Sequence, residues 1–363
     1  MKALILGGTT FLGRHLVRAL VERGHETAIF TRGRTQADES LPIVRYVGDR
    51  DGDLRTIPRN GWDAVIDTSG YVPAIVAASC AHLATAGRYL FTSSISVYDS
   101  SVATIGEGLS PYAPRVADRT DDDSQNYGPS KKRSEDVVCA VFNDRALLVR
   151  PGVLAGPYDP TNRFTYWVDR FAEGGDIAVP GPPERYVQFI DARDAAAFMI
   201  RLLEDGRSGI YDVNGLPKTT TMEELTNTAL ATYERAASVV WLDERFLEKH
   251  GITGWVDLPL WLGPSHAMPG FMNTNVDRSL EDGLLIRPLA ETIRDTRAWS
   301  STASRTASVP LRPSRRPGSR ENASVKSSPR GAVLPLTSNR LKRELSKSSC
   351  ERRFTACRLG IKR

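Results

Sequence analysis

A glycine-rich turn between an apolar strand and an amphipathic helix opens this 363-residue sequence. The run Lys2–Leu6 has the character of a buried strand, and the spacing of apolar residues predicts a helix over Phe11–Arg23. Glycines stand where the chain must turn tightly and where helix and strand approach closely. A helix N-terminus in this setting offers N–H groups and a positive dipole end to a pyrophosphate. We therefore expect dinucleotide contacts from Gly7, Thr9, Thr10, Phe11, Leu12 and Gly13, with an ordinary strand–helix turn as the alternative.

Short apolar runs alternate with helical segments along the first half of the chain. Strands are predicted over Glu26–Phe30, Ile43–Val47, Ala64–Asp67, Tyr89–Thr92 and Ala146–Val149, and helices over Ala74–Ala86 and Tyr127–Phe142. A helix over Asp191–Leu203 and a strand over Gly209–Val213 continue the pattern. This alternation predicts an α/β protein with a Rossmann-type, doubly wound parallel sheet.

Composition changes after the sixth predicted strand and predicts two parts. Residues 1–155 should form the nucleotide-binding domain, with its sheet completed by about residues 187–214. Residues 156–186, rich in Gly, Pro and aromatic side chains, should join residues 215–299 in a smaller C-terminal substrate lobe. Helices are predicted in that lobe over Met222–Tyr233, Asp243–Lys249 and Pro288–Trp299.

The basic net charge resides at the end of the chain. Residues 301–363 contain 16 Lys and Arg against 3 Glu, whereas the first 300 residues contain 32 against 40 acidic residues. We expect residues 300–363 to be a tail that is disordered or translated out of frame, so that truncation after Trp299 leaves stability unchanged. A nucleic-acid partner is expected only through this tail.

The remaining bulk features predict a cytoplasmic protein, as a monomer or homodimer, with no membrane partner. The sequence has no apolar run of about 18 residues, as a spanning helix would need, and no secretory signal. The four cysteines lack the spacing of metal ligands, so no metal is expected.

Three hydroxyl and amino groups near the fifth predicted strand carry the expected chemistry. Tyr127 and Lys131 stand four residues apart at the start of a helix and so share a face. A nearby ammonium favours the phenolate, which allows a phenol to exchange a proton with a substrate oxygen. Ser94 ends the fifth strand, at the edge of a parallel sheet where ligands bind, and can hold that oxygen. A surface pair on a helix and a polar loop with local hydrogen bonds are the alternatives.

The segment after the second predicted strand bears on whether the dinucleotide is NAD or NADP. Phe30-Thr31-Arg32-Gly33-Arg34 has no carboxylate for the ribose hydroxyls that NAD-specific sites bind, and two arginines that suit a 2′-phosphate. We therefore expect an NAD(P) cofactor, with NADP favoured over NAD through Arg32 and Arg34. A solvated charge cluster is the alternative.

Over about residues 1–299 the chain resembles the NAD(P)-dependent epimerase/dehydratase family, an extended or atypical branch of the short-chain dehydrogenases/reductases. The resemblance rests on the glycine turn, SSISVY, YGPSK, RPGVLAGPYDP and VQFIDARDAA, in that order. It implies Ser94, Tyr127 and Lys131 as catalytic residues, and cofactor contacts from Ser93, Asp49, Arg50, Pro151 and Val153. The chain departs from the family pattern at Thr10, where a glycine is usual, and at Thr31, where an Asp is usual.

The sequence thus predicts an NAD(P)-dependent oxidoreductase or isomerase that transfers hydride at a carbinol or carbonyl carbon. Ile95 and Ser96 beside Ser94 lack the acidic group of a dehydratase, which favours an epimerase or a reductase. The substrate is expected to be a sugar nucleotide or another small molecule, with Arg163, Arg185 and Gln188 as candidate contacts. The alternative is a dinucleotide-binding regulatory or RNA-binding protein without turnover.

Overall fold

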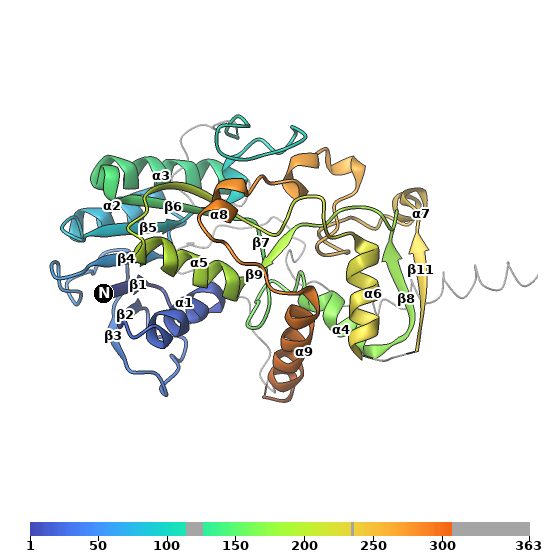
Figure 1. Ribbon diagram of the computed structural model, residues 1–363, viewed down its shortest axis with the longest axis horizontal. Helices are drawn as coiled ribbons and strands as arrows, with labels where there is room; N and C mark the ends of the chain where they lie inside the picture. Colours follow the sequence, from blue (N-terminus) through green and yellow to red (C-terminus); the bar gives the residue numbers. More distant parts are fainter. Residues whose placement is uncertain (114–125, 234–235, 307–363) are drawn as a thin grey trace, which may run out of the picture.

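A seven-stranded parallel sheet forms the centre of the computed structural model, which describes residues 1–113, 126–233 and 236–306 (Figure 1). The strand order is β10-β6-β5-β4-β1-β2-β3, and every neighbouring pair is parallel. The strands are β1 Lys2–Leu6, β2 Glu26–Thr31, β3 Ile43–Val47, β4 Ala64–Asp67, β5 Arg88–Thr92, β6 Ala146–Pro151 and β10 Gly209–Val213. The predicted Rossmann-type α/β fold is confirmed.

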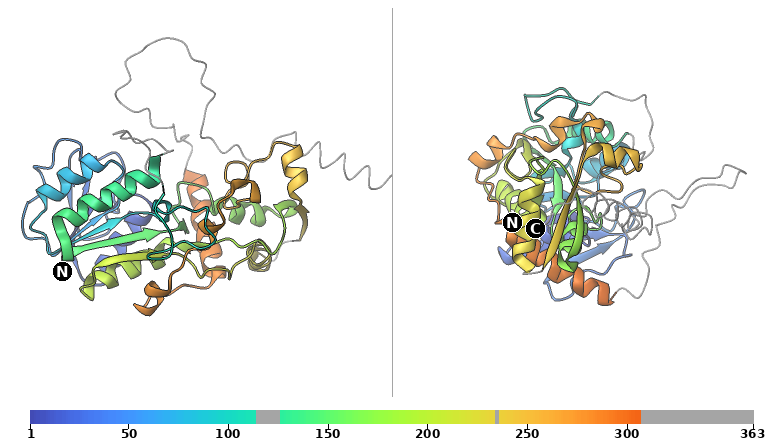
Figure 2. Two further views of the ribbon diagram at one scale, coloured as in Figure 1. Left: turned by 90° about the horizontal axis from the view of Figure 1, so that it is seen from above. Right: turned by 90° about the vertical axis from the view of Figure 1, so that its right-hand side faces the viewer.

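Helices cover both faces of the sheet, which is why its central strands are apolar along their whole length. Helices α1 (Phe11–Glu22) and α5 (Ala192–Glu204) lie on one face, and α2 (Pro73–His82) and α3 (Tyr127–Phe142) on the other (Figures 1 and 2). One buried cluster joins Leu16 of α1 to Met199 of α5 across the first face. A second joins Val76 of α2 to Val138 of α3 across the opposite face.

Most of the chain beyond β6, apart from α5 and β10, builds a smaller lobe beside the carboxyl ends of the strands (Figure 2). Its parts are a parallel pair of β8 (Gly175–Pro180) and β11 (Ala237–Leu242), with α4 (Thr165–Glu173), α6 (Met222–Tyr233) and α7 (Glu244–Lys249). A short pair, β7 (Val153–Ala155) with β9 (Phe189–Asp191), connects the two regions, and α8 (Asp277–Glu281) follows later in the chain. Trp167 and Phe171 are fully buried in the core of the lobe.

Secondary structure in residues 156–186 was not predicted from the sequence. The dense Gly and Pro signals indicated turns, yet α4 and β8 lie between them. The predicted helix over Asp243–Lys249 begins one residue later, because Asp243 caps it by accepting a hydrogen bond from the Phe246 N–H at 2.8 Å. Within the described residues, no helix is long and apolar enough to cross a membrane.

The predicted helix over Pro288–Trp299 also ends later than expected. Helix α9 spans Leu289–Thr306, so the boundary placed at Trp299 is wrong for residues 300–306. The Ser300 side chain is buried, and its hydroxyl donates to an Asp169 carboxylate oxygen at 2.6 Å. The rest of the expected tail, including Cys350 and Cys357, lies outside the described residues.

We expect a chain that ends at Trp299 to be less stable than one that ends at Thr306, by about 1–2 kcal/mol, since it loses the Ser300–Asp169 hydrogen bond. Urea denaturation of the two chains measures the difference. In the longer chain, Ser300→Ala should reproduce most of the loss. Ser301→Ala is the matched control, because among the described residues the Ser301 hydroxyl bonds only its own helix, at the Ala298 carbonyl. Equal stability of the two chains would instead support an end of the folded region at Trp299.

Candidate active site

The glycine turn at the carboxyl end of β1 has no room for side chains. Gly7 has φ +120°, and a Cβ there would lie 2.3 Å from Thr68 Oγ1. A Cβ on Gly13 would lie 2.8 Å from the Gly8 nitrogen, so only glycine lets α1 approach the turn. Thr10 precedes α1 with extended backbone. The turn therefore presents bare backbone at a helix N-terminus, which is the form that binds a pyrophosphate.

A hydrogen-bonded loop after β2 lies against this turn. Thr31 Oγ1 accepts from Arg45 Nε at 3.3 Å, and Arg45 also donates to the Thr35 carbonyl at 2.9 Å. The Thr35 hydroxyl lies 2.5 Å from that of Thr9. Arg45 is a site residue that sequence reasoning missed, because only the parallel register of β3 beside β2 brings it to Thr31.

Two predicted phosphate contacts project from the same loop. Arg32 and Arg34 are both exposed. Within the part of the chain that the structure describes, neither forms an ion pair. Their charges are therefore available to a ligand bound at the end of β2.

Arg50 has a partner set that the sequence did not predict. Its guanidinium forms a two-pronged ion pair with buried Asp67 and donates to Ser79 Oγ at 2.8 Å and to Ser69 Oγ at 3.2 Å. Burial alone would raise the pKa of the Asp67 carboxyl, but the Arg50 charge and hydrogen bonds hold that pKa below its usual value. Asp49 next to it is exposed. Dinucleotide contacts from both residues stay a prediction.

Helix α3 begins directly against the loop that carries Ser94. A Cβ on Gly128 would lie 1.9 Å from the Ser96 carbonyl oxygen, so the glycine of YGPSK is required by this close approach. Ser94 is buried and caps the short 3₁₀ turn Ile95–Val97, where its Oγ accepts from the Ser96 N–H at 3.1 Å. The loop thus places Tyr127 beside the end of β5.

Lys131 lies at the carboxyl ends of β4 and β5. Its side chain is 3% exposed, and Nζ donates to the Gly70 carbonyl at 2.8 Å and the Thr92 carbonyl at 2.9 Å. The ammonium lies 4.8 Å from the ring centroid of Tyr71 and 5.9 Å from that of Tyr127. The i, i+4 pair predicted from the sequence therefore faces the interior of the site and not solvent.

Further predicted cofactor contacts lie at neighbouring strand ends. Pro151 ends β6, and Val153 begins β7. Ser93 follows β5, and its hydroxyl, like that of Thr92, is buried without a hydrogen-bond partner among the described residues. Buried hydroxyls seldom lack a partner, so these two oxygens suit a polar ligand.

The three predicted substrate residues differ in their availability. Gln188 is buried, and its amide bonds the backbone of Gly215 and Thr274, which gives it a structural role. Arg185 donates to Glu244 Oε1 and to the Leu262 carbonyl, both at 3.3 Å. The Arg163 guanidinium lies 4.7 Å from the Trp255 ring centroid. Arg163 is thus the most available of the three to a ligand.

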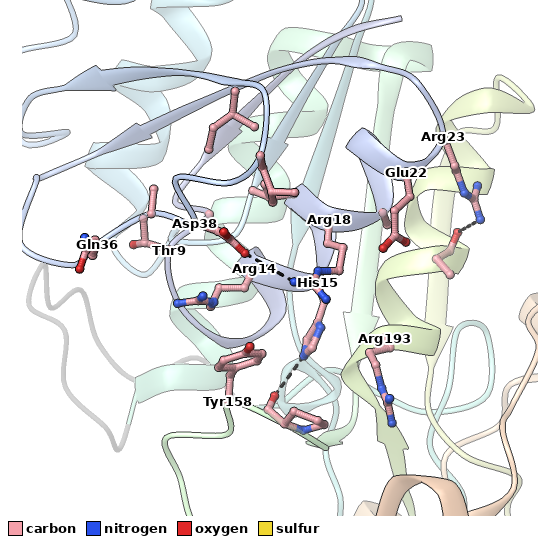
Figure 3. Close-up of a pocket in the computed structure, with 18 of the residues that line it drawn as sticks. Thr9, Arg14, His15, Arg18, Glu22, Arg23, Gln36, Asp38, Tyr158 and Arg193 are labelled. Atoms are coloured by element: carbon pink, nitrogen blue, oxygen red, sulfur yellow. Dashed lines mark hydrogen bonds and ion pairs between the residues drawn. The ribbon is translucent and has the colours of Figure 1, made fainter. Parts of the chain in front are cut away.

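Two hollows are each lined by one predicted site residue, Tyr127 in the first and Thr9 in the second. Tyr127 lines an open hollow with Ser96, Tyr98, Met268 and Phe271, of a form that a substrate could enter. A cleft of about 510 Å³ follows α1, with Arg14 stacked 4.5 Å from the Tyr158 ring centroid and Arg18 3.5 Å from Asp38 (Figure 3). Among the described residues, Thr9 is the one predicted dinucleotide contact in this cleft. The hollow beside Tyr127 is therefore the better candidate for the reacting substrate.

Groups of three or more metal-ligating side chains are absent from residues 1–113, 126–233 and 236–306.

Comparison with known proteins places these features in a family. Residues 3–214 match the model of the NAD dependent epimerase/dehydratase family. The solved structure of UDP-glucuronic acid 4-epimerase from Bacillus cereus in complex with NAD covers 84% of this chain and 99% of its own, with 13% identity and a TM-score of 0.61. That likeness shows a shared fold.

Two curated relatives have different names. The chloroplast stem-loop binding protein of 41 kDa b of Arabidopsis thaliana is 27% identical over 59% of this chain and 58% of its own. Ceramide reductase of Caulobacter vibrioides (strain NA1000 / CB15N) is 28% identical over 58% of this chain and 63% of its own. The chain thus spans about three fifths of the length of either relative.

Replacement of Arg50 tests its ion pair. Arg50→Met should destabilise the protein by about 3–5 kcal/mol, because it leaves the Asp67 carboxylate buried without its cation. The depressed pKa of Asp67 means that this contribution is present at neutral pH and declines as the pH falls through that pKa. Urea denaturation at pH 7 measures the loss. Arg55→Met is the control, since Arg55 is exposed and pairs with exposed Asp53; equal effects would contradict the structural role of Arg50.

Proposed function

The chain belongs to the NAD dependent epimerase/dehydratase family, and from this premise we propose that it transfers hydride at a carbinol or carbonyl carbon with Tyr127 as acid/base. The observation that carries the proposal is Lys131, a buried ammonium that contacts the Tyr127 ring at the carboxyl ends of β4 and β5. In open α/β sheets ligands bind at such strand ends, where the strand order reverses. Here that point lies between β1 and β4.

The residues at the switch point fit a dinucleotide. Gly7 and Gly13 stand where any Cβ would clash, so the backbone of the turn can approach a pyrophosphate closely. The hydroxyls of Thr92 and Ser93 have no hydrogen-bond partner among the described residues, and we assign them to the nicotinamide end of the dinucleotide. When bound, NAD(P) supplies the acceptor or donor of the hydride.

Proton transfer is assigned to the phenol of Tyr127. Its oxygen takes the proton of a substrate hydroxyl during oxidation and returns it to the carbonyl oxygen during reduction. The Lys131 ammonium stabilises the phenolate electrostatically. Ser94 holds the substrate oxygen, for which its hydroxyl must exchange its present contact with Ser96. Microscopic reversibility then lets one site serve a reductase or an epimerase.

Residues around Tyr127 suggest the size and character of the substrate. The hollow that it lines is flanked by Met268 and Phe271, and Arg163 stacks on Trp255, which makes an edge-to-face contact with Phe271 at 5.4 Å. A molecule with both an apolar part and an anionic group matches this lining. UDP-glucuronic acid, which is anionic, and ceramide, which is largely apolar, each offer one of these features. Both are suggested by the names of the similar proteins and are the first compounds to test.

Tyr127→Phe should lower turnover by a factor on the order of 10²–10⁴, the usual worth of a general acid or base. Dinucleotide affinity should stay nearly unchanged, because the phenol acts on the substrate oxygen. Absorbance of reduced dinucleotide at 340 nm and chromatography of the sugar products measure turnover. Tyr71→Phe is the matched control, as the Tyr71 ring also contacts Lys131.

A Tyr127→Phe protein with wild-type turnover would overturn this mechanism. The competing role, a dinucleotide-regulated RNA-binding protein, draws on the relative named a stem-loop binding protein. Binding of an RNA hairpin by a chain that ends at Thr306, with no turnover by the wild type on any compound tested, would favour that role.

Arg32 and Arg34 support a preference for NADP. Each could form charge-assisted hydrogen bonds to the 2′-phosphate, and Arg45 holds the loop from which they project. Arg32→Ala should therefore weaken NADP binding by about tenfold and leave NAD binding unchanged. Calorimetry with both dinucleotides measures the two affinities, with exposed Arg55→Ala as control. Equal NAD and NADP affinities of the wild type would contradict the preference.

A further inference from the structure

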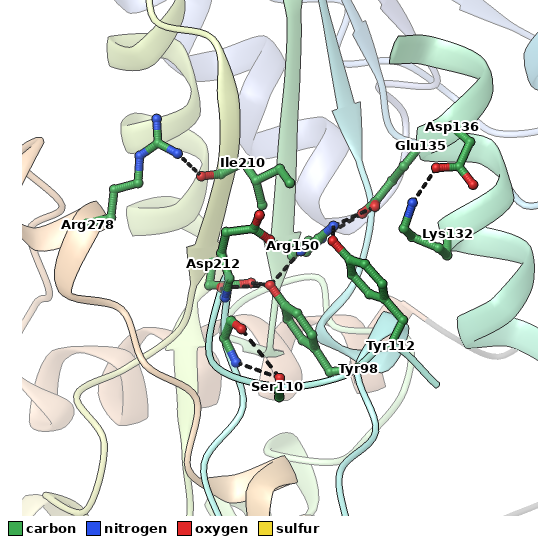
Figure 4. Close-up of polar contacts among 12 residues, drawn as sticks. Tyr98, Ser110, Tyr112, Lys132, Glu135, Asp136, Arg150, Ile210, Asp212 and Arg278 are labelled. Atoms are coloured by element: carbon green, nitrogen blue, oxygen red, sulfur yellow. Dashed lines mark hydrogen bonds and ion pairs between the residues drawn. The ribbon is translucent and has the colours of Figure 1, made fainter. Parts of the chain in front are cut away.

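The proposed mechanism does not use a buried polar network around Arg150, near the end of β6 (Figure 4). The Arg150 side chain is fully buried. It donates from Nε and a terminal nitrogen to both Glu135 carboxylate oxygens, at 2.7 and 2.6 Å. Its other terminal nitrogen donates to Tyr98 Oη at 2.5 Å and to Glu107 Oε2 at 2.8 Å. One guanidinium thus joins three segments that are distant in the sequence.

The first branch of the network reaches the helix of the candidate acid/base. Glu135 is 1% exposed and lies on α3, one turn beyond Lys131 and two turns beyond Tyr127. Residues at this spacing share one face of a helix. The paired hydrogen bonds from Arg150 therefore fix the rotation and the axial position of that face against β6.

The second branch reaches the loop of Ser94. The Tyr98 hydroxyl accepts from Arg150 and donates to the Asp212 carboxylate at 2.9 Å, which ties the loop to β10 as well as to β6. Burial, aided by the Asp212 charge, raises the pKa of Tyr98, so its hydroxyl stays a donor. The Ser96 carbonyl in the same loop lies against Gly128, directly after Tyr127. The position of the loop thus sets the position of the first turn of α3.

Burial of this network is unfavourable in free energy, because its charged groups lose their hydration. Arg150 faces the carboxylates of Glu135, Glu107 and Asp212, and burial raises the pKa of Asp212 to about 6. Apolar side chains of similar size often serve a core as well or better than a buried ion pair. Hydrogen bonds are directional and fix the relative positions of the groups they join, which apolar packing does not. Both branches of this network end at elements that carry residues of the proposed site.

We propose that Arg150 is a positioning residue, which holds Tyr127 and the Ser94 loop in register at the carboxyl ends of β5 and β6. The inference rests on the proposed function for its purpose. The positioning itself is a property of the folded chain that can be measured without a substrate.

The test is a pH titration of the Tyr127 phenol in the full chain. NMR of protein with tyrosine labelled at ¹³Cζ monitors the titration, and the signal missing from Tyr127→Phe identifies the Tyr127 resonance. Tyr98→Phe removes the hydroxyl that ties the loop to Arg150 and Asp212. We expect the titration midpoint of Tyr127 to rise by at least about half a pH unit, because the phenol loses alignment with the Lys131 ammonium. Tyr112→Phe is the matched control, since the Tyr112 hydroxyl lies 3.4 Å from Arg150 and its side chain is exposed. It should leave the midpoint unchanged.

Glu135→Gln tests the other branch and should also raise the titration midpoint of Tyr127. This variant alone tests the positioning role of Arg150 if Tyr98→Phe does not fold. Unchanged midpoints in both variants, or an equal change in Tyr112→Phe, would overturn the positioning role. Turnover plays no part in this readout. A failure of the Tyr127→Phe activity test would therefore remove the catalytic assignment and leave the positioning result standing.

Discussion

Parallel pairing of β1 with β2 on one side and β4 on the other decides where the glycine turn and the loop after β2 meet the end of β4. Because all these strands are parallel, the loops after β1, β2, β4 and β5 lie at one edge of the sheet. The strand order reverses at β1, with β2 on one side and β4 on the other. Backbone groups at that edge are left unpaired by the ladder, and side chains or ligands must satisfy them. Lys131 does so for two carbonyls, those of Gly70 and Thr92.

Two guanidinium groups, that of half-buried Arg50 and that of buried Arg150, form ion pairs with buried carboxylates near this edge. Arg50 pairs with Asp67 at the end of β4, and Arg150 pairs with Glu135 next to the end of β6. Each joins elements whose relative position is not fixed by apolar packing alone, because apolar packing is non-directional. The chain therefore combines apolar contacts between helices and sheet, which provide most of the stability, with a few directional hydrogen bonds, which hold the loops.

The departures from the family pattern concentrate at one place, the dinucleotide end of the site. Thr31 occupies the position of a carboxylate, and its hydroxyl is bonded by Arg45. The result is a basic cluster beside the glycine turn, with Arg32 and Arg34 on the loop after β2 and Arg45 on β3. The proposed proton-transfer residues, Tyr127 and Lys131, stand four residues apart at the start of α3. The solved structure of UDP-glucuronic acid 4-epimerase shares the fold at 13% identity.

The sequence by itself determined the α/β class, the glycine turn and the bounds of most central strands, because alternation of short apolar runs with amphipathic segments is a local signal. It also placed Tyr127 and Lys131 on one helical face. It did not predict α4 and β8, whose Gly and Pro signals pointed to turns, or residues 300–306 of α9, where Ser300 is buried against Asp169. Only the tertiary structure decided the partners of Arg45, Arg50, Arg150 and Gln188. An arginine or glutamine looks the same in a sequence whether it is solvated or buried, and its partner is set by strand register and packing between residues distant along the chain.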